Sequence, residues 1–397
     1  MEQLSYLSPF NTYPEVCGQF AFSKQLTLCD CTLRDGEQQA GIVLSKEDKV
    51  AIALAMDAMG IPEIEAGMPC NSVEDAEAIR EIVQLCKRSR ITACVRGMEA
   101  DFDLAADLGV WGVTISLPIG TLQRKHKLKW DDDTYIANMK QLTAYAKAKG
   151  LYVNLSPYDT TRCDPDFLDR LMAEVVACGT VDRVRLVDTV GAASPEAIAY
   201  LTRRMKAILG DKVLLEIHCH DDFGLAVAST LAGALAGADV LSTTINGLGE
   251  RAGNTATEEI LVALKLLYQV DLGADLSKLM AVSQLVERLS NAPLQKHKAI
   301  VGKHAFSHES GMVVAGVLEE AFVAEAYRPE LVGQQREILI GKKSGAKSLE
   351  AKLHQSGIYL DPDAVKHLLQ DVKELALVKK RSLTDEEFFY LVTPYQG

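Results

Sequence analysis

Two histidines separated by one residue occur in the stretch IHCHDDFG, residues 217–224. Alternate side chains of a strand point the same way and lie roughly 6.5–7 Å apart. His218 and His220 could therefore bind one metal ion if the segment is extended. A carboxylate from elsewhere would complete a set of two histidines and one carboxylate, which leaves positions open for a substrate. The alternative is that both histidines only form hydrogen bonds with neighbouring loops.

Asp35 is the candidate carboxylate, because it follows a predicted first strand and stands beside Arg34. The Arg34 guanidinium could stabilise charge that develops on a metal-bound carbonyl oxygen, or it could form an ion pair with Glu37 or Glu65. Thr189 could donate a hydrogen bond to a substrate carboxylate, or it could cap the following helix. These residues predict a metal-assisted enzyme for a carbonyl or carboxylate substrate and leave its reaction undefined.

A glycine-rich stretch, NGLGERAGN at residues 246–254, also carries Arg251. Exposed backbone N–H groups together with a guanidinium can hold an anion. The spacing of the glycines is not that of a P-loop or a dinucleotide fingerprint, and tight turns alone explain many such glycines. This stretch supports a metal site only in combination with the histidine pair and Arg34–Asp35.

The elements that must position these residues alternate between short apolar runs and longer amphipathic stretches. Predicted helices include 46–59, 72–87, 131–149 and 195–209, and predicted strands are 25–30, 63–66, 91–95, 112–116, 152–156, 184–187, 214–218 and 241–246. Such alternation predicts a parallel sheet, and about eight units over roughly 250 residues predict an α/β fold, a TIM (β/α)8 barrel. The polar candidates gather near the carboxyl ends of the strands, where such barrels hold their active sites.

The strand–helix alternation stops near residue 270. We therefore expect an N-terminal segment at residues 1–24, a catalytic barrel at 25–270 and a mostly helical C-terminal region at 271–397. No low-complexity tract or long flexible linker precedes the C-terminal region. It is expected to pack on the barrel or on a neighbouring subunit.

The composition is that of an ordinary globular protein, with 48% hydrophobic and 24% charged residues among 397. A formal net charge of −12 argues against nucleic acid or an anionic membrane as the main partner. Nine cysteines without a C-x-x-C pair indicate free thiols in a reducing compartment. Because the sequence contains no evident signal peptide and no apolar run that could cross a bilayer, we expect a cytoplasmic protein.

Five motifs, in this order along the chain, resemble the signatures of one enzyme family: LRDGEQQAG (33–41), IEAGMP (64–69), VDTVG (187–191), HCHDDFG (218–224) and NGLGERAGN (246–254). That family is the 2-isopropylmalate, homocitrate and citramalate synthases, which belong to the DRE-TIM metallolyases. Further stretches look most like the homocitrate synthases of nitrogen-fixing bacteria, namely ISLPIGTLQRKHKL (115–128), FSHESG (306–311) and LIGKKSG (339–345). The resemblance covers residues 25–395, nearly the whole chain.

The resemblance implies a divalent ion, either magnesium, manganese or zinc, that is bound by Asp35, His218 and His220 with Asn254 nearby. A 2-oxo acid would chelate this ion through its carboxylate and keto oxygens. Acetyl-CoA would lose a proton from its methyl group and add to the keto carbon, and hydrolysis of the thioester would follow. Family members are commonly homodimers in which the C-terminal region is exchanged between subunits.

The resemblance also assigns roles to residues around the ion. Arg34 would polarise the keto group, Arg96 and Thr189 would contact the acid, and Glu65 is a further catalytic candidate. These assignments imply that the expected partners are a 2-oxo acid and acetyl-CoA, with neither nucleic acid nor a membrane among them.

Three positions depart from the family pattern. Tyr158 stands where a glutamate is usual, Val313 replaces a histidine that takes part in the base, and Ala324 replaces a tyrosine. A thioester methyl group is a very weak acid, so its deprotonation requires a positioned base. Substitute bases are His308, Tyr158 and Glu309, and His308 is the one we select as catalytic.

We therefore predict a homocitrate synthase-like acyltransferase that condenses acetyl-CoA with a 2-oxo acid. One alternative is a divergent metal-dependent lyase, aldolase or decarboxylase that acts on a 2-oxo or 2-hydroxy acid without deprotonating acetyl-CoA. A second alternative is a catalytically silent paralogue with a binding role.

Overall fold

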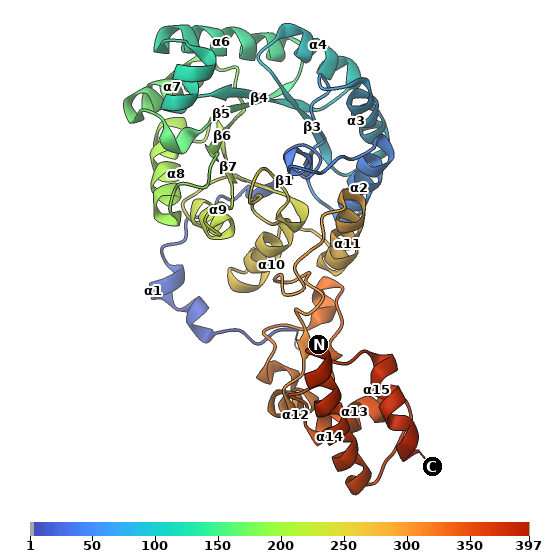
Figure 1. Ribbon diagram of the computed structural model, residues 1–397. Helices are drawn as coiled ribbons and strands as arrows, with labels where there is room; N and C mark the ends of the chain where they lie inside the picture. Colours follow the sequence, from blue (N-terminus) through green and yellow to red (C-terminus); the bar gives the residue numbers. More distant parts are fainter. Residues whose placement is uncertain (1–3, 397) are drawn as a thin grey trace. The chain divides into compact units, whose positions relative to one another are not determined.

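The computed structural model describes residues 4–396 and contains a closed barrel of eight parallel strands, each paired with its neighbours in chain order, with β1 beside β8 (Figure 1). The strands are β1 Thr27–Asp30, β2 Glu63–Glu65, β3 Arg90–Val95, β4 Gly112–Pro118, β5 Tyr152–Tyr158, β6 Arg183–Asp188, β7 Leu214–Cys219 and β8 Val240–Thr243. All eight predicted strands are present, and the predicted TIM barrel is confirmed.

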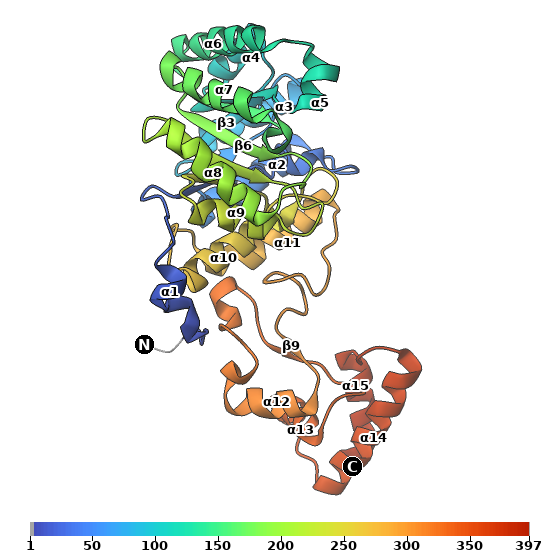
Figure 2. The ribbon, with the colours of Figure 1, turned by 90° about the vertical axis from the view of Figure 1, so that its left-hand side faces the viewer.

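Helices form a ring outside the strands (Figure 1), and in Figure 2 α8 lies in front of β6. The ring comprises α2 Lys46–Met59, α3 Val73–Leu85, α4 Glu99–Leu108, α6 Asp132–Ala148, α7 Pro165–Cys178, α8 Pro195–Leu209, α9 Ala226–Leu235 and α10 Thr257–Leu267. Several of these helices begin at a capping side chain that accepts a backbone N–H bond, such as Ser45 before α2 and Ser72 before α3. At these helices the cap ends the strand–helix connection at a defined residue.

The chain divides into two compact units, Pro9–Pro293 and the described residues of 1–8 and 294–397. The expected barrel boundary at residue 270 therefore shifts, because α11 Leu279–Ser290 belongs to the barrel unit. Its Ser283 carbonyl accepts a hydrogen bond from Asn246 Nδ2 at 3.0 Å. This contact joins the segment after β8 to α11 and fixes the helix in the barrel unit.

The expected N-terminal segment, residues 1–24, is divided between the two units. Ser23 Oγ donates a hydrogen bond to Asp239 in the barrel unit at 2.6 Å, whereas Tyr6 N–H donates one to the Ala326 carbonyl at 2.9 Å in the other unit. The segment is therefore not a separate domain.

The C-terminal unit is mostly helical, as predicted. It contains α12 Gly311–Glu319, α13 Ala346–Gln355, α14 Pro362–Lys379, α15 Asp385–Val392 and a two-stranded sheet of β9 Ser307–His308 and β10 Glu337–Ile338 (Figure 2). Its apolar core includes Leu349, Leu368 and Phe388, which are fully buried or nearly so. Within residues 4–396, no helix combines the length and the apolar character that crossing a membrane requires.

Candidate metal centre and substrate pocket

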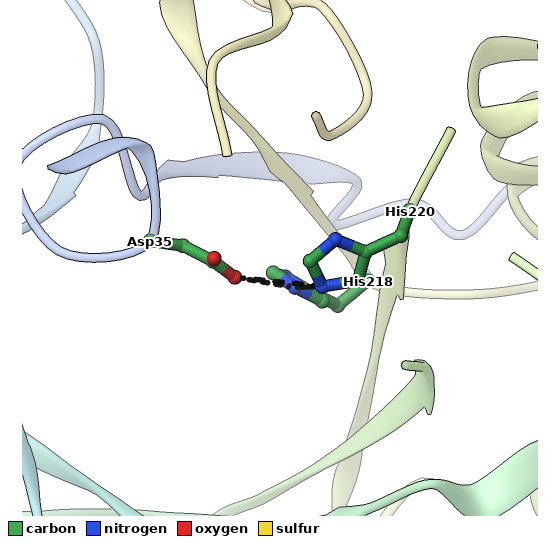
Figure 3. A group of neighbouring side chains, drawn as sticks. All are labelled: Asp35, His218 and His220. Atoms are coloured by element: carbon green, nitrogen blue, oxygen red, sulfur yellow. Dashed lines mark hydrogen bonds and ion pairs between the residues drawn. The ribbon is translucent and has the colours of Figure 1, made fainter. Parts of the chain in front are cut away.

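Three side chains meet at the carboxyl end of the barrel, with ligand atoms that all lie within 4.8 Å of one another: Asp35, His218 and His220. Asp35 Oδ2 lies 2.9 Å from His218 Nε2 and 3.7 Å from His220 Nε2. All three residues are buried. Figure 3 shows the carboxylate and the two rings pointing toward one another. The structure thus brings together the three predicted ligands.

The local backbone explains this convergence. His218 lies in β7, and His220 follows the end of that strand, where it forms an antiparallel bridge with Asn254. Asp35 comes from the tight turn after β1, in which its N–H donates to the Cys31 carbonyl at 2.9 Å. Ser242 Oγ in β8 lies 2.8 Å from His218 Nδ1. Such an outer partner fixes the orientation of a ligating imidazole, here with Nε2 toward Asp35.

Three buried polar atoms at this place have no hydrogen-bond partner among the described residues: Asp35 Oδ1, His220 Nδ1 and Asn254 Oδ1. A buried acceptor without a partner costs free energy. A divalent cation accepts carboxylate and amide oxygens as ligands, so the unpartnered Asp35 and Asn254 oxygens suit a bound ion. The donor set therefore fits the predicted metal site, with Asn254 as the predicted neighbour.

The glycine-rich stretch serves the packing around Asn254. A Cβ on Gly249 would lie 2.1 Å from Asn254 Nδ2, so a larger residue would displace the amide. Arg251 is already paired, with its Nε 2.8 Å from Asp222 Oδ1 and its Nη2 2.7 Å from the Thr189 carbonyl. At Gly249 the close packing against Asn254 therefore requires a glycine.

The electrostatic surroundings keep Asp35 and His220 in protonation states that suit a bound cation. Burial alone would raise the pKa of Asp35, but Arg34 and the two histidines hold that pKa well below its usual range. Burial lowers the pKa of His220 to about 4, so its ring is neutral near pH 7. Burial also acts to lower the pKa of His218, yet the hydrogen bond to Asp35 makes the net shift upward. An anionic carboxylate and a neutral imidazole are ready to bind a cation.

Arg34 is held between two carboxylates. Its Nη1 lies 3.2 Å from Asp35 Oδ2, and its Nε donates to Glu65 Oε1. Glu65 is fully buried and also accepts hydrogen bonds from Thr114 Oγ1 at 2.7 Å and from Arg185 Nη2 at 2.8 Å. The pair with Glu65, one of the two alternatives for Arg34, is therefore present. Glu65 thus contacts Arg34 inside the barrel, and its catalytic role stays a prediction.

Alternating charges continue from Glu65 through the barrel interior. Arg185 Nη2 also lies 2.9 Å from Glu216 Oε1, Arg183 Nε lies 3.1 Å from Glu216 Oε2, and Arg183 Nη1 lies 3.1 Å from Glu63 Oε2. All four of these side chains are almost completely buried. We call Arg34, Glu65, Arg185, Glu216, Arg183 and Glu63 the ion ladder. Its Arg34 end meets the candidate ligand Asp35.

A cavity of about 470 Å³ opens beside the ligands. Of the predicted site residues, those that line it are Arg34, Asp35, Arg96, Thr189, His218 and His220. Ser116, from the expected substrate pocket, lines it too, and further lining residues that the sequence did not single out include Gln123, Lys127, Ser156 and Arg185. The repeat of arginine in RVRLVD, at 183 and 185, was the available signal for a cation facing the barrel interior.

The two predicted substrate contacts already have protein partners. Arg96 is half-exposed and binds Asp101, with Nε 3.0 Å from Oδ2 and Nη2 2.9 Å from Oδ1. Thr189 Oγ1 accepts the Asp159 N–H at 2.7 Å, which leaves its hydroxyl hydrogen for another acceptor. Ser194, not Thr189, caps α8. The capping alternative for Thr189 is therefore wrong.

The proposed base candidates are divided between the units. Tyr158 lines the cavity, and burial raises the pKa of its phenol, which disfavours the phenolate. His308 belongs to the C-terminal unit, where its Nε2 lies 3.1 Å from Glu325 Oε1. Glu325 is in turn bound by Arg336 at 2.6 Å. Glu309 is committed to Ser382 Oγ at 2.9 Å and to a backbone N–H.

Comparison with known proteins agrees with this architecture. The HMGL-like family matches residues 25–286, and the homocitrate synthase post-HMGL domain-like family matches residues 300–380. The fold resembles an HMG-CoA lyase of Bacillus subtilis, with a TM-score of 0.62 and 20% identity over 69% of this chain and 96% of that one. A TIM barrel of the DRE-TIM metallolyase class is thus established.

The sequence relatives define the family more narrowly. Homocitrate synthase AksA of Methanothermobacter thermautotrophicus is 38% identical over 99% of this chain and 98% of its own length. Homocitrate synthase 1 of a Nostoc species is 39% identical over 91% and 96%, and 2-isopropylmalate synthase 2 of Caldanaerobacter subterraneus is 38% identical over 94% and 96%. The chain belongs to the homocitrate and 2-isopropylmalate synthase family of acyltransferases, which confirms the predicted family and enzyme class.

Proposed function

We propose that this protein condenses acetyl-CoA with a 2-oxo acid at the carboxyl end of its barrel and releases CoA. The observation that carries the proposal is the convergence of Asp35, His218 and His220 beside the Arg34 guanidinium. Relatives named homocitrate synthase and 2-isopropylmalate synthase support the same reaction class. None of the comparisons favours the lyase or the silent-paralogue alternative.

Asp35, His218 and His220 would hold the divalent ion, with the Asn254 amide oxygen as a further neighbour. When bound, magnesium, manganese or zinc would supply a Lewis acid for the carboxylate and keto oxygens of the 2-oxo acid. Arg34 would donate hydrogen bonds to the keto oxygen as negative charge develops there. Glu65 keeps the guanidinium in place for this task through its hydrogen bond to Arg34 Nε.

The rest of the cavity would orient the acid. The Thr189 hydroxyl hydrogen is available to a substrate carboxylate, since its oxygen accepts the Asp159 N–H. Arg96 stands at the rim of the cavity and could exchange Asp101 for a second substrate carboxylate. Ser116 and Ser156 add hydroxyl groups to the lining. A 2-oxo acid with a polar or anionic side chain fits these surroundings.

His308 is the base that we propose for acetyl-CoA. A base removes a methyl proton, the resulting carbon nucleophile attacks the keto carbon, and the keto oxygen becomes a hydroxyl group after protonation. Water then cleaves the thioester, which yields CoA thiol and a carboxylate. The Glu325 carboxylate orients the His308 ring and would stabilise it once protonated. Burial would raise the pKa of Glu325, but Arg336 and His308 lower it, so the carboxylate stays anionic.

We further propose a cytoplasmic homodimer, as is common in the family, with no nucleic acid or membrane partner. The net charge of −12 supports the last point. Light scattering of the purified protein measures the oligomeric state, and a monomer would contradict the proposed dimer.

The function is tested by incubating metal-loaded protein with acetyl-CoA and a panel of 2-oxo acids while free thiol is measured. Thiol release that depends on one 2-oxo acid, with a 2-hydroxy diacid or triacid as product, is the expected result. Pyruvate or CO₂ formed from a 2-oxo or 2-hydroxy acid without thiol release would identify a lyase instead. Absence of both reactions would contradict any catalytic role.

A further inference from the structure

The segment after β4 concentrates positive charge on an otherwise acidic protein. Residues 124–129 read RKHKLK, in a chain whose net charge is −12. Within the described chain, Lys125, His126 and Lys129 are exposed and form no ion pair. Lys127 makes a cation–π contact only, with its Nζ 5.5 Å from the centre of the Tyr158 ring. We call residues 124–129 the basic turn. Its lysines are available to an anionic ligand.

Residues of the basic turn line two cavities of the barrel unit. Its backbone is a π-helical turn, Arg124–Leu128, that continues the short helix α5, Thr121–Gln123. Gln123 and Lys127, four residues apart and on one helical face, line the cavity beside the metal ligands. Arg124, Lys125 and Lys129 line a second cavity of about 460 Å³. One ligand that lies along this turn could reach both cavities.

The acidic residues near the second cavity do not neutralise its lysines. Asp131 caps α6 by accepting the Thr134 N–H at 2.8 Å, and Asp164 caps α7 by accepting the Phe167 N–H at 2.9 Å. The positive ends of those helices compensate both carboxylates. Asp132 pairs with Arg124 Nη2 at 2.7 Å, and the Arg124 Nε beside it is buried without a partner. The lysines and this N–H leave the cavity cationic.

We propose that the second cavity binds the phosphate groups of the acyl-CoA substrate, while the thioester end passes Lys127 into the metal cavity. Lys125 and Lys129 would contact the phosphates as exposed ammonium groups, and Trp130, which also lines the cavity, offers an indole face on which a purine base can stack. This inference rests on the proposed function and assigns the subsite that recognises the nucleotide part of the thioester.

The test compares Lys125→Ala/Lys129→Ala with the control Lys24→Ala/Lys212→Ala. The control removes two exposed lysines that precede β1 and β7, at the amino ends of the strands and away from the metal ligands. We expect the KM for acetyl-CoA to rise about tenfold at low ionic strength in the first variant only, because two exposed charge contacts are lost. The KM for the 2-oxo acid should not change. Acetyl-pantetheine, which lacks the nucleotide and its phosphates, should react equally well with both variants.

Calorimetric binding of CoA and of inorganic phosphate keeps this test independent of turnover. A fall of about tenfold in CoA affinity in the Lys125/Lys129 variant supports the subsite even if no condensation is observed. Absence of condensation together with this fall would contradict the proposed function and leave the subsite supported. Unchanged CoA affinity in this variant, or an equal loss in the control, overturns the subsite. Inorganic phosphate that competes as strongly as CoA would also overturn it, because the site would then be one for free phosphate.

Discussion

Replacing Glu65 with glutamine should weaken metal binding although Glu65 is not a ligand. Glu65 and Asp35 share the Arg34 guanidinium, and Asp35 Oδ2 is the oxygen 2.9 Å from His218 Nε2. With a neutral side chain at position 65, Asp35 is the carboxylate among the described residues that still forms an ion pair with Arg34. The guanidinium would then compete with a bound cation for the same oxygen.

The size of this effect follows from the 3.2 Å separation of Arg34 Nη1 and Asp35 Oδ2. At an effective dielectric constant of about 20, such a pair interacts by about 5 kcal/mol. If the Arg34–Asp35 pair strengthens by a quarter to a half of that value, metal affinity falls about 10- to 100-fold. Outer-shell substitutions at metal sites commonly have effects of this size, about 10- to 100-fold.

The assay is titration of metal-free protein with Mn²⁺ or Zn²⁺ by calorimetry, together with urea unfolding. Glu63→Gln is the matched control, since Glu63 is also buried and pairs with Arg183 at the other end of the ion ladder. Both variants should lose about 3 kcal/mol of unfolding free energy, because each leaves a buried guanidinium less well paired. Only Glu65→Gln should lose metal affinity. Equal metal affinity in the two variants would refute the reasoning.

Three further predictions concern other residues. Burial raises the pKa of Asp30 to about 7, whereas the same carboxyl group in the unfolded chain loses its proton near about pH 4. The proton on Asp30 therefore stabilises the native state fully below about pH 4, and this stabilisation is lost as the pH rises through about 7. Urea unfolding should therefore show that the stability of wild type relative to Asp30→Asn falls by about 4 kcal/mol from pH 4 to pH 8, and a constant difference would contradict it. Arg34→Lys should lower kcat about 100-fold with a small change in the KM for the 2-oxo acid, because lysine cannot bind Glu65 and the keto oxygen together. A rise in this KM with an unchanged kcat would instead argue for a binding role. His308→Gln should lower kcat about 100-fold, whereas full activity in this variant would exclude His308 as the base. Val313→His in that variant should restore part of the turnover.

The strands and the three metal ligands could be predicted because their signals are local. Alternate spacing placed His218 and His220 on one face of a strand, and Asp35 followed the first apolar run directly. Because all strands of such a barrel are parallel, Asp35 and the histidine pair, which follow or end their strands, had to lie at the same end of the barrel. The structure agrees, with Asp35 Oδ2 and His218 Nε2 only 2.9 Å apart.

The contact between Glu65 and Arg185 and the domain boundary could not be predicted because they depend on contacts between distant residues. Glu65 pairs with Arg185, which lies 120 positions further along the chain, and no local pattern shows which guanidinium reaches a buried carboxylate. The barrel unit ends at residue 293 and not at 270, and the hydrogen bond from Asn246 to Ser283 is one of the long-range contacts that join α11 to it. The cap of α8 was predictable, since Ser194 stands directly before Pro195, the first residue of the predicted helix.

The measurement that tests the central claim most directly is CoA thiol release in the presence of acetyl-CoA and the preferred 2-oxo acid, before and after removal of metal with a chelator. Wild type should lose its activity with the chelator and regain it when a divalent ion is added back. Asp35→Ala and His218→Ala should remain inactive at the same metal concentration, although both should fold. Activity that survives chelation, or that persists in both variants, would contradict a role of this metal centre in the reaction.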